Sequence, residues 1–149
     1  MILEPSRRGV RDIAETSDPT PRAVSEELPP ALNAARYARK LVTDACLRWN
    51  LPDLIHPATL IISELVSNVV DHAHTVMTIE VAHRDSQLYL AVHDGASAPP
   101  ELRQLDSALP LRGRGLMLVA AAATTWGYDH REDGKTVWAT VAPPDVTHP

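Results

Sequence analysis

Residues 58–73 read ATLIISELVSNVVDHA and carry the strongest periodic pattern in the chain. At about 100° per residue their apolar members form one broad stripe, which predicts an amphipathic helix packed on a core. The stripe comprises Ala58, Ile61, Ile62, Leu65, Val66, Val69, Val70 and Ala73. A helix with so wide an apolar face needs another layer of secondary structure to cover it.

The period changes from helical to alternating directly after this helix. Residues 76–84 (VMTIEVAHR) and 87–94 (QLYLAVHD) alternate between apolar and polar side chains, and Asp85-Ser86 stands between them as a turn. This pattern predicts a β-hairpin. A hairpin next to a broad amphipathic helix indicates a layered fold with helix on sheet.

The rest of the chain predicts two further helices and three further strands. In chain order these are a strand over 23–28, a helix over 31–49, a helix over 113–123 and strands over 125–130 and 135–142, with a turn at Glu132-Asp133-Gly134 between the last two. Residues 1–22 and 143–149 predict terminal tails on one domain over 23–142. The loop over 95–112 is long enough to be a functional loop. This order predicts a two-layer α/β (α+β) sandwich, with helices on one face of a mostly antiparallel sheet.

Composition excludes several classes of protein. The chain has 149 residues, 44% of them apolar, so it can bury a core, and its net charge of −5 argues against a basic nucleic-acid surface. The single Cys46 excludes a disulfide framework and a cysteine-based zinc cluster, and its apolar neighbours predict an inert buried thiol. Uninterrupted apolar runs fall short of the roughly 18 residues of a membrane span, and nothing resembles a secretory signal. We therefore expect a cytoplasmic protein.

Three polar side chains interrupt the helix predicted over 58–73. Glu64, Asn68 and His72 stand four residues apart, so they form one column roughly 100° from the centre of the apolar face. A carboxylate and an amide at this flank can reach into a pocket without full desolvation. The spacing alone equally allows ordinary boundary residues of an amphipathic helix. A zinc site with His74 is disfavoured, because the H-E-x-x-H spacing is missing.

Residues 112–116, RGRGL, open the helix predicted to follow the long loop. Gly113 and Gly115 let the backbone approach a ligand closely, and the free N–H groups of a helix N-terminus suit a phosphate. Arg112 and Arg114 would screen the charge of a polyphosphate. A flexible helix entry would give the same pattern.

Asp94 ends a predicted strand immediately before the long loop. A carboxylate in this place can accept a hydrogen bond from an exocyclic amine, such as N6 of adenine. The alternative is a turn-forming aspartate, since Asp94-Gly95 is a common turn sequence.

The order of these motifs resembles one protein family. An E-x-x-x-N-x-x-x-H helix is followed by a hydrophobic strand ending in Asp, a proline-bearing loop, G-x-G-L and GKTVWA. This set is similar to the Bergerat-fold (GHKL) ATPases and, within them, to the anti-sigma-factor serine/threonine kinases of bacteria. The resemblance covers about residues 28–142, with ELVSNVVDHA close to the family's N box and RGRGLMLV close to its second glycine box. It implies ATP and Mg²⁺ as cofactors.

The resemblance also implies roles for individual residues. Asn68 matches the asparagine whose side-chain oxygen ligates Mg²⁺, and Glu64 matches the acid that orients or deprotonates the attacking nucleophile. Asp94 matches the aspartate that reads adenine, and Thr136 would support the adenine through its hydroxyl. The other residues expected to contact the nucleotide are His72, Gly95, Arg112, Gly113, Arg114, Gly115 and Leu116.

The first glycine box departs from the family pattern. The family often reads D-x-G-x-G, whereas Asp94-Gly95 is followed here by Ala96, Ser97 and Ala98. Alanines in place of these glycines would make the loop on the adenine side stiffer or more crowded.

Two functions follow from the family resemblance and from the departure in the first glycine box. The first is a switch kinase that binds ATP and Mg²⁺, sequesters a sigma factor and phosphorylates Ser or Thr on a STAS-type anti-anti-sigma protein. The phosphate would add a charge of about −1.5 to −2 to the anti-anti-sigma protein and would disrupt the surface through which that protein docks. The alternative is a nucleotide-dependent or nucleotide-free binding module with little catalysis. Family behaviour implies a homodimer, and a sensor histidine kinase fits less well because no helical hairpin with a phosphoacceptor histidine precedes the predicted domain.

Deletion of residues 1–22 is expected to leave the melting temperature and the ATP affinity nearly unchanged. A segment with so few apolar anchors cannot offset about 1–2 kcal/mol of ordering entropy per residue. Thermal melts of the full and shortened chains, with and without Mg·ATP, test this expectation. A melting temperature lowered by many degrees would show that the segment packs on the domain.

Overall fold

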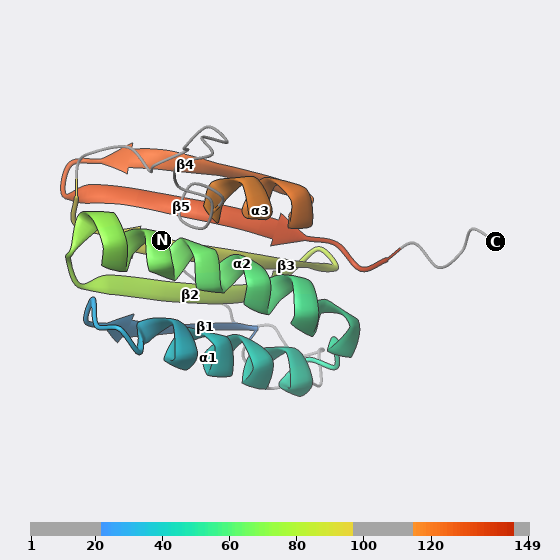
Figure 1. Cartoon of the computed structure of the whole chain (residues 1–149). Helices are drawn as coiled ribbons and strands as arrows, with labels where there is room; N and C mark the ends of the chain where they lie inside the picture. Colours follow the sequence, from blue (N-terminus) through green and yellow to red (C-terminus); the bar gives the residue numbers. More distant parts are fainter. Residues whose placement is uncertain (1–21, 97–114, 145–149) are drawn as a thin grey trace, which may run out of the picture.

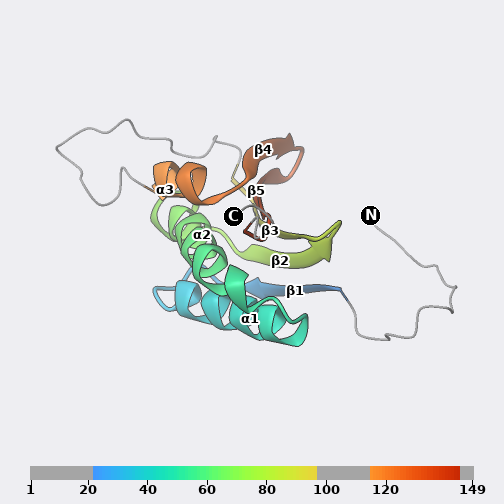
Figure 2. The same ribbon diagram turned by 90° about the vertical axis from the view of Figure 1, so that its right-hand side faces the viewer.

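The alternating segments form one open sheet in the computed structural model, which describes residues 22–96 and 115–144. Its strands are β1 (Ala23–Leu28), β2 (Met77–Arg84), β3 (Gln87–Asp94), β4 (Thr125–Arg131) and β5 (Gly134–Val141). They pair antiparallel throughout, in the spatial order β1-β2-β3-β5-β4 (Figure 1). The helices cover one face of this sheet, as Figure 2 shows, so the predicted fold class is confirmed.

Three helices, α1 (Ala34–Arg48), α2 (Ile55–Asn68) and α3 (Gly115–Ala122), make up the second layer. A short 3₁₀ turn, η1 (Pro52–Leu54), leads into α2, and a wider turn, η2 (Val69–Ala73), follows it. Helix α2 lies between the other two and contacts both of them as well as the sheet (Figure 1). Its buried residues, Ala58, Ile61, Ile62, Leu65 and Val66, belong to the apolar stripe predicted from the sequence.

Aliphatic side chains fill the space between the layers, because the chain has no Phe. The largest fully buried ones on the strands include Ile79, Leu88 and Leu90. Complete burial of such a side chain stabilises the fold by about 1.5–3 kcal/mol. Cys46 on α1 is fully buried, as predicted, and desolvation raises the pKa of its thiol to about 11. A thiol with so high a pKa is almost entirely protonated at neutral pH and is a poor nucleophile.

The run Pro52–Ala73, which contains α2, is long and apolar enough to cross a membrane by length and composition, with a mean hydropathy of 1.2. A search for uninterrupted apolar residues misses it, because Ser63 and Glu64 break the run. In the structure this run supplies the central helix of the sandwich, and the buried stripe of α2 faces the other helices and the sheet. The core of the domain accounts for its hydropathy.

The predicted elements are present, but several of their ends are shifted, and α2, for example, begins at Ile55 rather than at residue 58. Helix α1 begins at Ala34 rather than at residue 31, because the backbone N–H groups of Ala31 and Ala34 bond to Pro29 and Ala31 carbonyls in tight turns first. The strand predicted over 23–28 has these bounds in the structure, and the backbone N–H of His83 also donates to the carbonyl oxygen of the preceding Arg22 at 2.9 Å.

The turn predicted at Asp85-Ser86 is confirmed. Both residues have positive φ, 51° and 66°, as a two-residue turn of type I′ requires. This turn matches the right-handed twist of the strands and fixes the register of β2 on β3, in which Arg84 pairs with Gln87.

Gly134, at the start of β5, is the glycine on which the geometry of the neighbouring strand end depends. Its φ is 148°, a conformation that residues with a side chain rarely adopt. A Cβ at this position would overlap the backbone carbonyl of Asp94, at the end of β3. Only glycine therefore allows the second hairpin to come this close to Asp94.

Replacement of Gly134 by alanine is expected to lower the free energy of unfolding by about 2 kcal/mol or more, because strain and overlap add. Chemical denaturation of the variant measures this loss. Gly95→Ala is the matched control: a Cβ there would meet the Thr75 side chain at an ordinary 3.7 Å, so its cost should be much smaller. Equal stabilities of the two variants would contradict the argument.

Candidate functional site

The candidate site lies where β3 ends. Asp94, the last residue of β3, pairs with Met77 at the start of β2 and with Lys135 on β5. Because side chains alternate along a strand, Asp94 shares the face of the buried Leu90 and Val92, which is the helix-covered face. A carboxylate thus ends an otherwise apolar row of side chains.

The two oxygens of the Asp94 carboxylate have different surroundings. Oδ1 accepts hydrogen bonds from the backbone N–H of Ala96 at 2.8 Å and from Nζ of Lys135 at 3.1 Å. Oδ2 lies 3.1 Å from the same Nζ as an ion pair, yet it is buried and receives no hydrogen bond from the described residues. Since a buried acceptor without a donor costs free energy, Oδ2 is suited to an N–H group of a ligand.

The C-terminal end of α2 lies at the same end of the sandwich. Asn68 ends α2, η2 follows, and β2 then starts at Met77, the partner of Asp94. A hydrogen bond of 2.9 Å from the backbone N–H of Gly95 to Oγ1 of Thr75 ties the segment after η2 to the segment after β3. The structure therefore brings the predicted residues of α2 and β3 to one edge.

Glu64 and Asn68 are both half-buried and lie one turn apart on α2. Desolvation raises the pKa of the Glu64 carboxyl, and the Asp71 carboxylate raises it further. A carboxylate with a raised pKa is a stronger base, which suits proton acceptance. Asn68 offers an amide oxygen, a ligand type that Mg²⁺ accepts.

The predicted column of Glu64, Asn68 and His72 does not continue beyond Asn68. In η2 the backbone N–H of His74 donates to the carbonyl oxygen of Val69 at 2.8 Å. This hydrogen bond joins residues five apart, whereas an α-helix joins residues four apart. His72 is exposed on this wider turn, and His74 closes it with a φ of 58°. The expectation of a regular α-helix through residue 73 is wrong at this point.

Thr136 lies on the opposite face of the sheet from Asp94, so the expectation that its hydroxyl supports the adenine is corrected. Its register partner is His93, whose Nδ1 lies 2.6 Å from Oγ1 of Thr136. Nε of Arg131 donates to the same oxygen at 2.9 Å. Nε2 of His93 in turn bonds to Glu80 at 3.2 Å, and this bond lowers the pKa of the Glu80 carboxyl.

The residue of β5 that lies beside Asp94 is Lys135. Its side chain is 6% exposed, and Asp94 is its register partner. The sequence contains no local signal for this pair, because only the pairing of β3 with β5 sets the residue after Gly134 opposite Asp94. Because side chains alternate along a strand, Thr136, the next residue of β5, lies on the other face of the sheet.

The second glycine segment is described only from Gly115 onward. Gly115 begins α3, Leu116 follows it, and α3 packs against α2. Arg112, Gly113 and Arg114 lie outside the described residues, so their contacts stay predictions.

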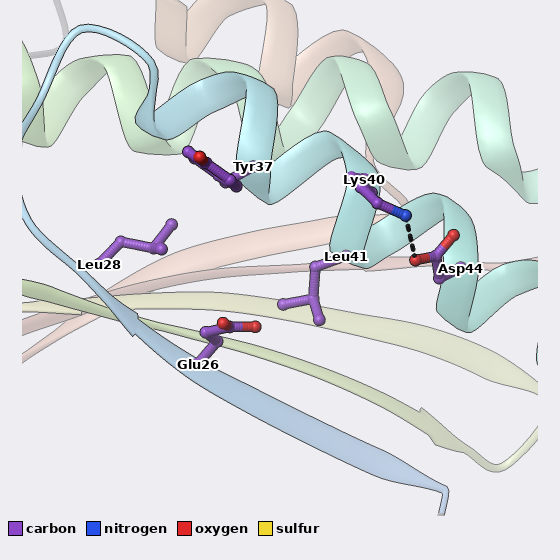
Figure 3. A pocket seen from close by; sticks show the side chains of 6 residues that line it. All are labelled: Glu26, Leu28, Tyr37, Lys40, Leu41 and Asp44. Atoms are coloured by element: carbon purple, nitrogen blue, oxygen red, sulfur yellow. Dashed lines mark hydrogen bonds and ion pairs between the residues drawn. The ribbon is translucent and has the colours of Figure 1, made fainter.

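Hollows border the described surface at the strand ends and beside α1. One of about 420 Å³ lies at the strand ends and is lined in part by Thr78, His93, Asp94, Arg131 and Lys135. The other, of about 230 Å³, lies between β1 and α1, where Lys40 and Asp44 form an exposed ion pair of 3.0 Å (Figure 3). The first is lined by two predicted site residues, Asp94 and Gly95, and the second by none. In residues 22–96 and 115–144, no three His, Cys, Asp or Glu side chains gather as a metal site.

Comparison with known proteins agrees with this geometry. The family model of the histidine kinase-like ATPase domain matches residues 28–141. The chain belongs to this family. Among solved structures, the ATPase domain is similar to the RsbU and RsbW domains of Rv1364c from Mycobacterium tuberculosis, with 22% identity over 84% of this chain and a TM-score of 0.61. It spans 33% of that chain, and the likeness is one of fold. Comparison with curated proteins gives no match.

Glu64→Gln is expected to raise the melting temperature of the ATPase domain by a few degrees at pH 7. The raised pKa means that the folded state disfavours the ionised form. The contribution of Glu64 to stability is therefore complete below its ordinary pKa of 4.5 and is lost as the pH rises through the raised value. Melts at pH 4 and pH 7 should show the gain only at pH 7.

Glu80→Gln is the matched control with the opposite sign. The pKa of Glu80 is lowered, so its contribution to stability is present above its ordinary pKa of 4.5 and is lost as the pH falls through the lowered value. This variant should melt lower than the unmodified protein at pH 7. A gain from both substitutions, or from neither, would refute the assignment of the two shifts.

Proposed function

We propose that the chain is an ATP-dependent protein serine/threonine kinase that regulates a sigma factor. The observation that carries this proposal is the buried Asp94 carboxylate, with an acceptor oxygen still open, at the end of the sandwich where Asn68 ends α2. Membership of the histidine kinase-like ATPase family supports nucleotide binding.

The residues present fit a magnesium nucleotide. Oδ2 of Asp94 would accept the exocyclic amine of adenine, and the Asn68 amide would supply one oxygen ligand to Mg²⁺. When bound, Mg²⁺ neutralises charge on the phosphates. Few protein ligands are needed, because Mg²⁺ keeps several waters and takes phosphate oxygens as well.

Glu64 would act as the base in phosphoryl transfer. It accepts the proton of a Ser or Thr hydroxyl on the partner as that oxygen bonds to the γ-phosphorus of ATP and the bond to the β-phosphate oxygen breaks. The products are a phosphorylated partner and ADP. The half-buried place and the raised pKa of Glu64 support this role.

The proposed partners are a sigma factor, which the protein sequesters, and a STAS-type anti-anti-sigma protein, which it phosphorylates. The fold similarity to the RsbU and RsbW domains of Rv1364c and the motif order of the sequence support this choice. We propose a cytoplasmic location, which the sigma-factor partner requires, and a homodimer.

A binding module with little catalysis is the second candidate. Ala96 favours it, because this residue stands where the family's first glycine box often has a glycine and its backbone N–H already bonds to Asp94. Such a module would bind its partner with or without nucleotide and would transfer no phosphate.

The test incubates the full chain with labelled ATP, Mg²⁺ and co-encoded STAS-type proteins, followed by detection of phosphoserine and phosphothreonine. Transfer of label that falls about 10²-fold or more in Glu64→Gln supports the kinase. Nucleotide binding without transfer supports the binding module. Absence of ATP binding contradicts both nucleotide-dependent functions.

Asn68→Ala is expected to abolish Mg²⁺-dependent ATP binding and to leave the fold intact. A half-buried amide at the end of α2 costs little to remove, whereas its loss deprives Mg²⁺ of its protein ligand. Calorimetric titration with Mg·ATP measures the effect. Ser67→Ala, the neighbouring half-buried position on α2, is the control that should bind normally. Unchanged affinity of Asn68→Ala would remove Asn68 from the site.

A further inference from the structure

We propose that Lys135 is a second base-reading residue, which donates a hydrogen bond to ring nitrogen N1 of adenine while Asp94 accepts one from the amine at C6. This inference rests on the proposed binding of ATP and deepens it. Neither the sequence motifs nor the family resemblance assigned a role to Lys135.

The position of Lys135 in β5 is unusual for a charged residue. Val137, Ala139 and Val141 follow it at alternate positions on the same face, and all three are buried. A buried lysine must lose most of its hydration, and an apolar residue in its place would leave the buried Asp94 carboxylate without its ion-pair partner. The ion pair with Asp94 accounts for the charge at this position, and it places the ammonium beside the carboxylate of the candidate site.

The ammonium of Lys135 has hydrogen-bonding capacity to spare. It carries three donors, and the described residues accept one of them, at Oδ1 of Asp94. Beside it, Oδ2 of Asp94 has no donor. The ammonium thus has hydrogens that no described residue accepts, and beside it lies Oδ2, which is 3.1 Å from Nζ in an ion pair but receives no hydrogen bond.

Adenine carries the complementary pair on one edge. The amine at C6 is a donor, and the adjacent N1 is an acceptor, so one approach satisfies Oδ2 of Asp94 and Nζ of Lys135 together. Asp94 alone would read only the amine. With Lys135 beside it, the site reads two neighbouring atoms of the base.

The experiment compares ATP with 1-deaza-ATP, which keeps the amine but has a C–H group in place of N1. The unmodified protein should bind 1-deaza-ATP about tenfold or more weakly than ATP, the scale of one charge-assisted hydrogen bond. In Lys135→Met this ratio should fall to about one, because the donor to N1 is gone. Calorimetry gives both affinities for each protein.

Two further variants keep the test decisive. Lys135→Gln replaces Lys135→Met if the latter does not fold, because it keeps an uncharged donor beside the Asp94 carboxylate. Its ratio of ATP affinity to 1-deaza-ATP affinity should lie between the ratios of the unmodified protein and of Lys135→Met. Lys40→Met removes an exposed lysine of α1 and should keep the full ratio. A ratio of one in the unmodified protein, or an unchanged ratio in the Lys135 variants, would overturn the role of Lys135 while ATP binding itself stands. Failure of the unmodified protein to bind ATP at all would refute the proposed function instead.

Discussion

The antiparallel register between β3 and β5 determines what stands at the candidate site. It sets Asp94 opposite Lys135 and His93 opposite Thr136, and the alternation of side chains then sends the two pairs to opposite faces. One pair faces the helices, and the other joins a polar network on the face that the described helices leave uncovered. Gly134 permits this register because it has no Cβ to meet the Asp94 carbonyl.

Much of this architecture could be predicted, because periodicity depends only on which side chains must leave water. The apolar stripe of α2 predicts the two layers, and the alternation in β2 and β3 predicts the hairpin. The wide turn η2 could not be predicted: Val69 and Val70 continue the helical pattern, and only the bond from His74 to Val69 shows that the winding changes. For this reason His72 does not continue the column that was predicted with Glu64 and Asn68.

Pairing of distant strands explains the error at Thr136 and the omission of Lys135. Local sequence predicts a strand over 135–142. It does not show which residue of this strand lies opposite Asp94, because Asp94 is about 40 positions earlier in the chain. That choice depends on packing across the whole sheet. The open oxygen of Asp94 was equally inaccessible to sequence reasoning, since it is a property of the surrounding atoms.

The two half-buried glutamates show how environment separates residues of one type. Glu80 is held ionised by His93 and contributes to the sheet, whereas Glu64 is kept in a setting that disfavours its charge. Desolvation is the main cause of the raised pKa of Glu64, whereas the hydrogen bond to His93 is the main cause of the lowered pKa of Glu80. The distinction supports a chemical role for Glu64 and a structural one for Glu80.

The buried thiol of Cys46 has a practical consequence. It is the only cysteine in the sequence, it has no exposed surface, and its high pKa leaves almost no thiolate at neutral pH. A cysteine introduced on the surface would therefore be the one group that maleimide dyes or spin labels modify in the native protein. Such a label would report distances and motions between the sheet and a bound partner, and Cys46 would not have to be replaced first.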